Sequence, residues 1–468
     1  MSDTATTLPD AASPAAVSPR FVTGSLLRHV VVMASTGAVG LVAVFFVDLI
    51  NLFYISMLGQ QPVAAAVGFA GVVAFFQISF CIGVMIAIVA VVSRAIGAGR
   101  AEEAKRLATA SLVLMAVSCV LVATATFVFL EQILDLLGAT GETRRQALGY
   151  LQITQLAMPF LGTGMACAGL MRAVGDARRS MSVTLTGAVV AAILDPILIF
   201  GLQLDLKGAA IASVMARMAM TGVGLYGCTR IHQMLGRFDS ARFVADARRI
   251  GKVAGPSILA NLATPFGAAF ITHFMAQFGT AAVAGLATID RLVPVAFGLL
   301  YALSGAVGPI IGQNFGAQRI DRVRQTLIES LRFMAVAVCA AWLLLALGQQ
   351  LIIYAFSAKG LSAELISLFC SVLAGSFFFL GALFVANAAF NNLGYPLYST
   401  GFNWARATLG TIPFAYVGSH YGAAGVLIGP AIGGVIFGSL AMFTAFRITR
   451  RLATSDSATS TTGHRRSR

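Results

Sequence analysis

The chain has 468 residues, of which 58% are hydrophobic and only 11% are charged, and its mean hydropathy is +0.86. A soluble core cannot bury so much apolar surface, so the composition excludes a soluble globular protein and predicts an integral membrane protein. The net charge of +14 does not indicate a nucleic-acid-binding protein, because the basic residues gather in the loops of one predicted membrane side.

Apolar stretches long enough to cross a hydrocarbon core of about 30 Å recur along the chain, separated by short polar clusters. Twelve such segments are predicted, all of them helical. They start near residues 28, 63, 105, 146, 180 and 207 in the first half, and near 250, 281, 324, 363, 397 and 422 in the second. The expected fold is therefore an all-α membrane protein with two parallel six-helix bundles around a central cavity.

Two tails flank the predicted bundles, and a linker joins one bundle to the other. Residues 1–24 are rich in Ala, Ser and Pro and lack a signal-peptide pattern, so they are expected to be a disordered, uncleaved tail. A similar tail is expected at 451–468. Between the tails, residues 25–230 form the predicted first bundle, 231–249 a basic linker and 250–450 the second bundle.

The distribution of Lys and Arg predicts the orientation in the membrane. Most lie in the tails and in the loops on the side of the termini, including the linker, which also suits anionic lipid headgroups. The opposite loops hold only Arg144, Arg145, Lys207 and Lys359. By the positive-inside rule, both termini are cytoplasmic. The preference for Arg over Lys is typical of GC-rich bacteria, and the expected location is the inner membrane.

An internal repeat relates the two halves. With an offset of 219, GAGR at 97–100 falls on GAQR at 316–319, and Gly175 falls on Gly394. Each half contains an even number of predicted segments, so the repeats run parallel and are related by an axis along the membrane normal. Two such bundles can rock against each other and expose a central cavity to either side in turn. The alternative is that duplication only builds a stable scaffold.

Several segments carry a family resemblance. They are VDLINLFYISMLG at 47–59, GLMRAVGDARRSM at 169–181, LDPILIFG at 194–201 and GPIIGQNFGAQR at 308–319. Jointly they resemble the multidrug and toxic compound extrusion (MATE) family, with a likeness that covers roughly residues 25–450. The resemblance implies export of small molecules by alternating access, driven by an ion gradient and without a bound cofactor.

Two carboxylates lie inside predicted membrane segments, where ionisable groups are costly and mark functional positions. Asp48 shares a helix face with Asn51, whose amide is a hydrogen-bond partner for it, and an apolar environment favours its protonated form part of the time. Asp195 precedes Pro196, which removes a backbone donor and favours a local bend. The alternative for each is a carboxyl group held in a purely structural hydrogen bond.

The resemblance implies a role for both carboxylates. In the MATE family, and in its DinF-like branch in particular, acidic residues at the positions of Asp48 and Asp195 couple substrate release to protons, or in some members to sodium. Here Ala191 stands where some members carry an Asn, and the predicted seventh and tenth segments carry no acidic residue. Proton exchange is therefore favoured. Under the repeat the two carboxylates fall near Ala268 and Phe414, so coupling is expected in the first half alone.

Uncharged polar residues among many Phe and Met predict a cavity for amphipathic substrates, and aromatic rings favour organic cations. The candidate cavity residues are Gln152, Gln155, Asn261, Thr264, Asn387, Asn391, Asp290 and Arg291. Consecutive helical residues point about 100° apart. Asp290 and Arg291 are therefore each expected to meet another helix. Arg406 and Arg217 are candidates for the same kind of pairing inside the bundles, either as structural ion pairs or as substrate contacts.

Other functions fit the sequence less well. A flippase for lipid-linked sugars is the alternative within the same superfamily, but only Arg217, Arg291 and Arg406 are available for a pyrophosphate headgroup. An enzyme is not expected, because the HExxH and GxSxG motifs are absent. The six Cys have no paired spacing that predicts a disulfide or a metal site. The chain is expected to work as a monomer whose partners are its substrates and membrane lipid.

Overall fold

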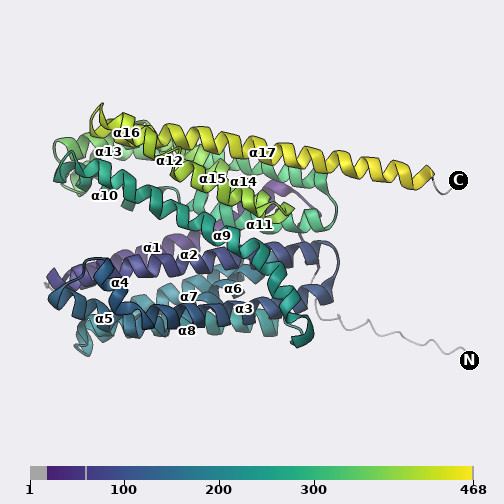
Figure 1. Ribbon diagram of the computed structural model, residues 1–468, viewed down its shortest axis with the longest axis horizontal. Coiled ribbons are helices and arrows are strands. Elements are labelled where there is room, and N and C mark those ends of the chain that lie inside the picture. Colours follow the sequence, from purple (N-terminus) through teal and green to yellow (C-terminus); the bar gives the residue numbers. More distant parts are fainter. Residues whose placement is uncertain (1–17, 58–60, 466–468) are drawn as a thin grey trace, which may run out of the picture.

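The computed structural model describes residues 18–57 and 61–465, and every regular element in these ranges is helical. The side chains of residues 455–465, and of several residues near the end of α1 and the start of α2, lie outside the description. Figure 1 shows two bundles side by side, one built from α1 to α8 and the other from α10 to α17. The helix α9 passes from the first bundle to the second. The chain enters α1 and leaves α17 at one end of the molecule, called here the termini end.

The first bundle contains eight α-helices and two π-helical turns. These are α1 (Leu26–Met57), α2 (Gln61–Gly97), α3 (Ala101–Val128), α4 (Leu130–Leu136), α5 (Gly141–Gln155), α6 (Met158–Ala173), α7 (Ala177–Pro196), η1 (Ile197–Gly201), α8 (Asp205–Tyr226) and η2 (Gly227–Ile231).

The second half contains nine α-helices and one 3₁₀ turn. These are α9 (Ser240–Ala276), α10 (Thr280–Ala296), α11 (Gly298–Gly316), α12 (Ile320–Ala355), α13 (Leu361–Ser371), η3 (Leu373–Ser376), α14 (Phe377–Leu393), α15 (Pro396–Ala407), α16 (Ile412–Ser419) and α17 (Ala423–Arg465).

The twelve predicted segments correspond to these helices, although several are broken. In the described part of the chain, nine helices are long and apolar enough to cross a membrane, and two bent pairs, α5 with α6 and α10 with α11, raise this number to eleven. The remaining predicted segment corresponds to α15 and α16, each of which is shorter than a membrane span. Large apolar side chains such as Leu344, Leu347 and Leu351 point outward on α12, as expected for a surface in contact with lipid.

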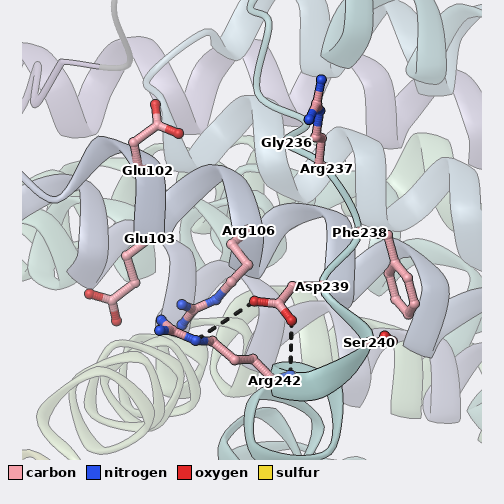
Figure 2. A pocket seen from close by; sticks show the side chains of 9 residues that line it. All are labelled: Glu102, Glu103, Arg106, Gly236, Arg237, Phe238, Asp239, Ser240 and Arg242. Atoms are coloured by element: carbon pink, nitrogen blue, oxygen red, sulfur yellow. Dashed lines mark hydrogen bonds and ion pairs between the residues drawn. The ribbon is translucent and has the colours of Figure 1, made fainter.

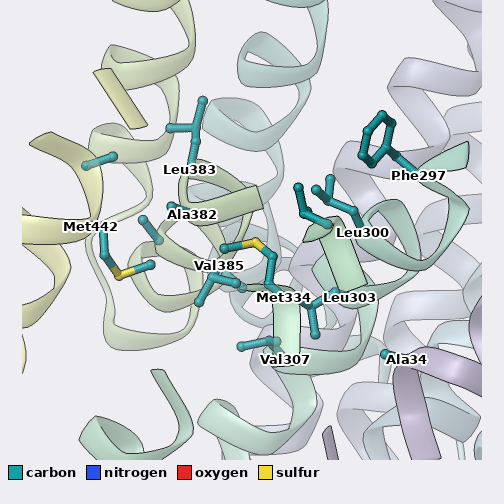
Figure 3. Packing of buried hydrophobic residues seen from close by; sticks show 14 of the residues in the cluster. Ala34, Phe297, Leu300, Leu303, Val307, Met334, Ala382, Leu383, Val385 and Met442 are labelled. Carbon is teal, nitrogen blue, oxygen red and sulfur yellow. The ribbon is translucent and has the colours of Figure 1, made fainter. Parts of the chain in front are cut away.

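Each half has its own apolar core. Figure 3 shows the core of the second half, in which Leu300 and Leu303 of α11 lie beside Met334 of α12. Phe297, at the break between α10 and α11, stacks on Phe377 with ring centroids 4.3 Å apart. Five of the six Cys are buried as small core residues, while Cys339 is exposed.

The helix α9 joins the two halves and begins earlier than predicted. It starts at Ser240, so the expected linker 231–249 includes its first turns. Ile250 is fully buried in the core of the first half. Further along, Trp404 of α15 donates a hydrogen bond from Nε1 to the carbonyl of Leu259 at 2.9 Å. The helix α9 therefore contacts both halves, through Ile250 in the first and Leu259 in the second.

Parts of the two predicted disordered tails are ordered in the structure. Phe21 is only 2% exposed; its N–H donates to Oε1 of Gln313 at 2.9 Å and its carbonyl accepts from Nη2 of Arg322 at 3.0 Å. Residues 18–24 are thus ordered by side chains that satisfy their backbone groups, while 1–17 lie outside the described residues. At the other terminus, α17 continues as a helix through Arg465.

The two halves meet at the termini end in a symmetric crossing of α2 and α11. A β-carbon on Gly97 would collide with the backbone of Gln313, and one on Gly316 would collide with the backbone of Arg94. The offset of 219 makes Arg94 equivalent to Gln313 and Gly97 equivalent to Gly316. The repeat found in the sequence therefore becomes a close helix crossing at which only glycine fits, called here the seam.

Candidate functional site

Among the side chains that the structure describes, Asp195 is a carboxylate buried deeply in a predicted membrane segment of the first half. It lies in the last turn of α7, just before Pro196, and the chain continues into the π-helical turn η1. Because proline cannot donate to the preceding turn, the helix widens at this point. The residue is 1% exposed. Its Oδ1 has no hydrogen-bond partner in the described part of the chain.

The other oxygen of Asp195 is held by a neighbouring helix. Asn51 of α1 donates from Nδ2 to Oδ2 of Asp195 at 2.8 Å. The sequence had offered Asn51 as a partner for Asp48, one turn earlier on its own helix. The backbone of Asp48 lies in α1, but its side chain lies outside the described residues. The observed bond joins α1 to α7 and leaves one buried carboxylate oxygen available to accept a proton or a further hydrogen bond.

The polar cavity candidates of the first half separate into two environments. Gln155 is buried where α5 bends into α6, and its Oε1 accepts a hydrogen bond from Nε2 of Gln77 at 2.6 Å. Its own Nε2 has no partner among the described residues. Gln152, one turn earlier, is exposed.

The cavity candidates of the second half lie on α9, α10 and α14. On α9, Asn261 donates to the carbonyl of Ser257 in its own helix at 2.8 Å, and Thr264 is exposed. On α14, Asn391 is buried, and the side-chain oxygens of both Asn387 and Asn391 lack a partner in the described chain. These unpaired amide oxygens are acceptors available to a substrate or to water.

Asp290 and Arg291 are exposed on α10 and do not pair with each other, as the helical spacing predicted. Neither forms an ion pair with any residue that the structure describes. The expectation that each of them pairs with another helix is therefore not met by an ion pair among the described residues. By contrast, the local pair expected between Glu329 and Arg332 is present at 3.0 Å.

Two polar side chains at the seam, Arg94 and Gln313, were not singled out from the sequence as a pair. Arg94 donates from Nη2 to the carbonyl of Asn391 at 2.6 Å, and Gln313 donates from Nε2 to the carbonyl of Ala173 at 2.7 Å. Each side chain thus reaches from its own half to a backbone carbonyl of the other. The repeat offset could have identified them, because it aligns Arg94 with Gln313.

A cavity of about 820 Å³ lies at the termini end, away from these groups. Figure 2 shows it between the start of α3, with Glu103 and Arg106, and the start of α9, where Asp239 contacts both the side chain and the backbone of Arg242. Arg106 also holds the buried carboxylate of Asp246 through Nε at 2.9 Å and Nη2 at 3.2 Å. Most of the charges are thus paired with one another, and we assign this cavity to the docking of α9 rather than to a substrate.

A second charged contact at this end fixes the start of α7. Asp176 caps the helix by accepting from the N–H of Arg179 at 3.1 Å. Its Oδ2 lies 3.0 Å from Nε2 of His232 and 2.6 Å from Nη1 of Arg179. The hydrogen bond with His232, supported by those with Arg179, holds the pKa of Asp176 well below its usual range.

The comparison with known families agrees with this architecture. A family model described as MatE matches residues 38–197 and 256–417, which together make up more than half of the chain. The chain belongs to the MatE family. The two matched stretches begin 218 residues apart, close to the offset of the internal repeat. Members of this family are transporters, so this MatE protein is a membrane transporter and not an enzyme.

Individual relatives cover most of this MatE chain. An FAD transporter of Shewanella oneidensis is 29% identical over 423 residues, or 89% of this chain and 93% of its own. The multidrug export protein MepA of Staphylococcus haemolyticus is 26% identical over 412 residues, or 86% of this chain and 90% of its own. Among solved structures, a mutant of the Vibrio cholerae MATE transporter VcmN is 25% identical, with a TM-score of 0.87 over 91% of this chain and 97% of its own.

Proposed function

We propose that this MatE transporter exports amphipathic small molecules in exchange for protons, with Asp195 as the group that carries the exchanged proton. The observation behind the proposal is the burial of Asp195 in a membrane segment with a single hydrogen bond, from Asn51, and one unpartnered oxygen. A carboxyl group in that environment can exist neutral or charged, and its charge state alters what it binds. Asp48, one turn before Asn51, is the second carboxylate of the proposed coupling site.

Proton exchange needs a change in helix packing that follows the charge of Asp195. The residue stands between the regular part of α7 and the π-helical turn η1, where Pro196 has already removed one backbone hydrogen bond. When Asp195 is charged, it attracts donors such as Asn51; when it is neutral, that attraction weakens. The junction of α1 and α7 is thus the element that protonation biases, and the seam at the termini end is the proposed cytoplasmic closure.

The proposed substrates follow from the expected polar and aromatic cavity and from the relatives. Organic cations suit a wall of aromatic rings and uncharged amides. The relative named as an FAD transporter adds a second candidate, a flavin nucleotide, because it is similar over 89% of this chain. The proposed location is the bacterial inner membrane with both termini in the cytoplasm, and the first-half carboxylates favour the DinF-like branch of the family.

Export from inverted vesicles tests the coupling ion. The efflux of a cationic dye and of FAD is followed while the pH gradient and the sodium gradient are collapsed separately. Export should stop when the pH gradient is collapsed and continue when the sodium gradient is collapsed. Loss of export on sodium collapse alone would contradict proton exchange, and vesicles without the protein provide the control for leakage.

A further inference from the structure

Three membrane segments of the second half are interrupted part-way along their length. The pair α10 and α11 bends by 50° at Phe297, α13 and α14 are separated by the turn η3, and α15 ends at Ala407 before α16 begins at Ile412. Interrupted helices inside a membrane are tolerated where they are buried in protein or line a water-filled space, and in transporters they mark binding sites. The side chains beside these breaks are therefore candidates for substrate contact.

Arg406 lies next to the break between α15 and α16. Its Nε is sealed from solvent and has no hydrogen-bond partner, and its guanidinium forms no ion pair or hydrogen bond with any residue that the structure describes. An unpaired guanidinium inside a membrane is costly when no carboxylate compensates its charge. The guanidinium of Arg406 therefore lacks a counter-charge among the described residues.

A polar group on another helix lies near Arg406. Tyr301, one turn after the break at Phe297, lies within electrostatic range of both Arg406 and Asp290. Its ring contacts Phe384 of α14, with centroids 5.7 Å apart. Neither the hydroxyl of Tyr301 nor the carboxylate of Asp290 has a hydrogen bond to the described residues. Tyr301 thus lies between two charged groups, Arg406 and Asp290, without pairing with either of them.

The position of Tyr301 places this group near the boundary between the two halves. On the same helix, Ala302 packs on Gly37 of α1, since a β-carbon on Gly37 would lie 3.4 Å from that of Ala302. A β-carbon on Gly298 would likewise lie 3.1 Å from Cγ2 of Val42 of α1. A molecule held between the bundles would therefore pass close to this group.

We propose that Arg406 and the hydroxyl of Tyr301 bind the anionic group, a carboxylate or a phosphate, of an exported substrate. This inference rests on the proposed export function and adds the charge that the substrate carries. A guanidinium offers a planar fork of N–H donors that matches two oxygens of such a group, and the tyrosine hydroxyl is a further donor. Asp290, when charged, repels the same anion and weakens its binding.

Paired binding and transport measurements on the full-length protein test this proposal, with FAD as the anionic probe and ethidium as the cationic one. Arg406→Gln should weaken FAD binding and raise the KM for FAD at least about tenfold, while the KM for ethidium stays within about twofold. Arg406→Lys, which keeps the charge but not the fork, should recover only part of the affinity. Asp290→Asn should strengthen FAD binding, because it removes a repelling charge.

One variant serves as a control, and four outcomes would contradict the proposal. Arg450→Gln removes an exposed arginine near the end of α17 and should leave both substrates unaffected. An equal loss of FAD and ethidium in Arg406→Gln would indicate a structural role and overturn the proposal, as would unchanged FAD affinity or a wild-type protein that does not bind FAD. Displacement of FAD by phosphatidylglycerol in the wild type but not in Arg406→Gln would assign the site to a lipid phosphate instead.

FAD binding, read from its fluorescence anisotropy in detergent, does not depend on transport. Binding that requires Arg406 in a protein that exports nothing would uphold the anion site and refute the proposed export function. Export of both probes without any effect of Arg406→Gln would uphold the export function and refute the anion site. The two proposals can therefore fail separately.

Discussion

The two halves of this transporter share an arrangement of helices but differ in the burial and hydrogen bonding of their membrane carboxylates. In the first half, Asp195 is buried and accepts a hydrogen bond from Asn51 at 2.8 Å. In the second half, Asp290 is exposed and lies near Tyr301 without a partner in the described chain. Under the repeat, Asp195 falls on Phe414. Duplication therefore preserved the helices and the seam, while the polar chemistry diverged between the halves, which we interpret as proton coupling in one and substrate selection in the other.

Replacement of Arg106 by Ala is expected to have the largest effect, because it leaves the buried carboxylate of Asp246 unpaired. The loss of stability should be about 2–3 kcal/mol, less than for a fully buried pair, since Arg106 is 23% exposed. Urea unfolding in detergent measures it. Lys105→Ala, which removes only a pair with the exposed Glu102, should change stability by no more than about 0.5 kcal/mol. Equal losses in both variants would show that α9 is not docked through Arg106.

The seam provides a test of symmetry between the halves. Gly97→Ala and Gly316→Ala should each destabilise the close contact of α2 with α11 by about 1–3 kcal/mol, because each β-carbon meets backbone of the other half. A cysteine introduced at Phe21, which is buried beside the seam, should be labelled faster in both variants. The matched control is Gly222→Ala, where a β-carbon meets open space. An effect of only one of the two seam glycines would contradict the symmetric closure.

A smaller effect is expected from Asn51→Ala, which removes the hydrogen bond to Asp195 but leaves the carboxylate in place. Loss of one such bond should slow proton-driven export about three- to tenfold. Thr36→Ala on the same helix serves as the control, because its hydroxyl bonds only the carbonyl of Val32 in its own helix. Export at the wild-type rate in Asn51→Ala would exclude this bond from the coupling.

The smallest change concerns Asp176, a helix cap that the second half lacks, since the equivalent residue Tyr395 makes no side-chain cap. Asp176→Ala should cost about 1 kcal/mol, and Asp176→Asn less, because Asn still accepts the capping bond. The pKa of Asp176 in the folded protein lies below its ordinary value of 3.8, so its contribution is present at neutral pH. It is lost as the pH falls below that value. Unfolding measured at neutral pH and near pH 3 should show the wild type and Asp176→Ala converging; a constant difference would contradict the assignment.

Much of the architecture could be predicted from the sequence, because hydropathy and the repeat report directly on membrane segments and on symmetry. Most predicted segments start within a few residues of the observed helices, whereas α9 begins at Ser240 instead of near 250. The difference arises because the polar first turns of α9 are held by contacts with α3, such as that between Arg106 and Asp246. A window of hydropathy cannot detect a helix whose polar turns are stabilised by distant charges.

The partners of the candidate site residues were less accessible to prediction. Helical spacing pairs Asn51 with Asp48 on its own helix, but it cannot reveal that Asn51 donates to Asp195, 144 residues away. It also predicted that Asp290 and Arg291 pair with other helices, and no such ion pair forms among the described residues. Spacing reports neighbours on one helix, whereas these contacts depend on how bent helices meet, and the breaks beside Phe297 and after Ala407 carry no clear hydropathy signal.

The division of roles between the halves is tested most directly by pH-driven export in Asp195→Asn and Asp290→Asn, compared in the same vesicles under the same imposed pH gradient. Both substitutions remove one membrane carboxylate and keep its shape. We predict that pH-driven export of a cationic dye is lost in Asp195→Asn and retained in Asp290→Asn. Retention of pH-driven export in a folded Asp195→Asn protein, or its loss in Asp290→Asn alone, would contradict the assignment of coupling to the first half.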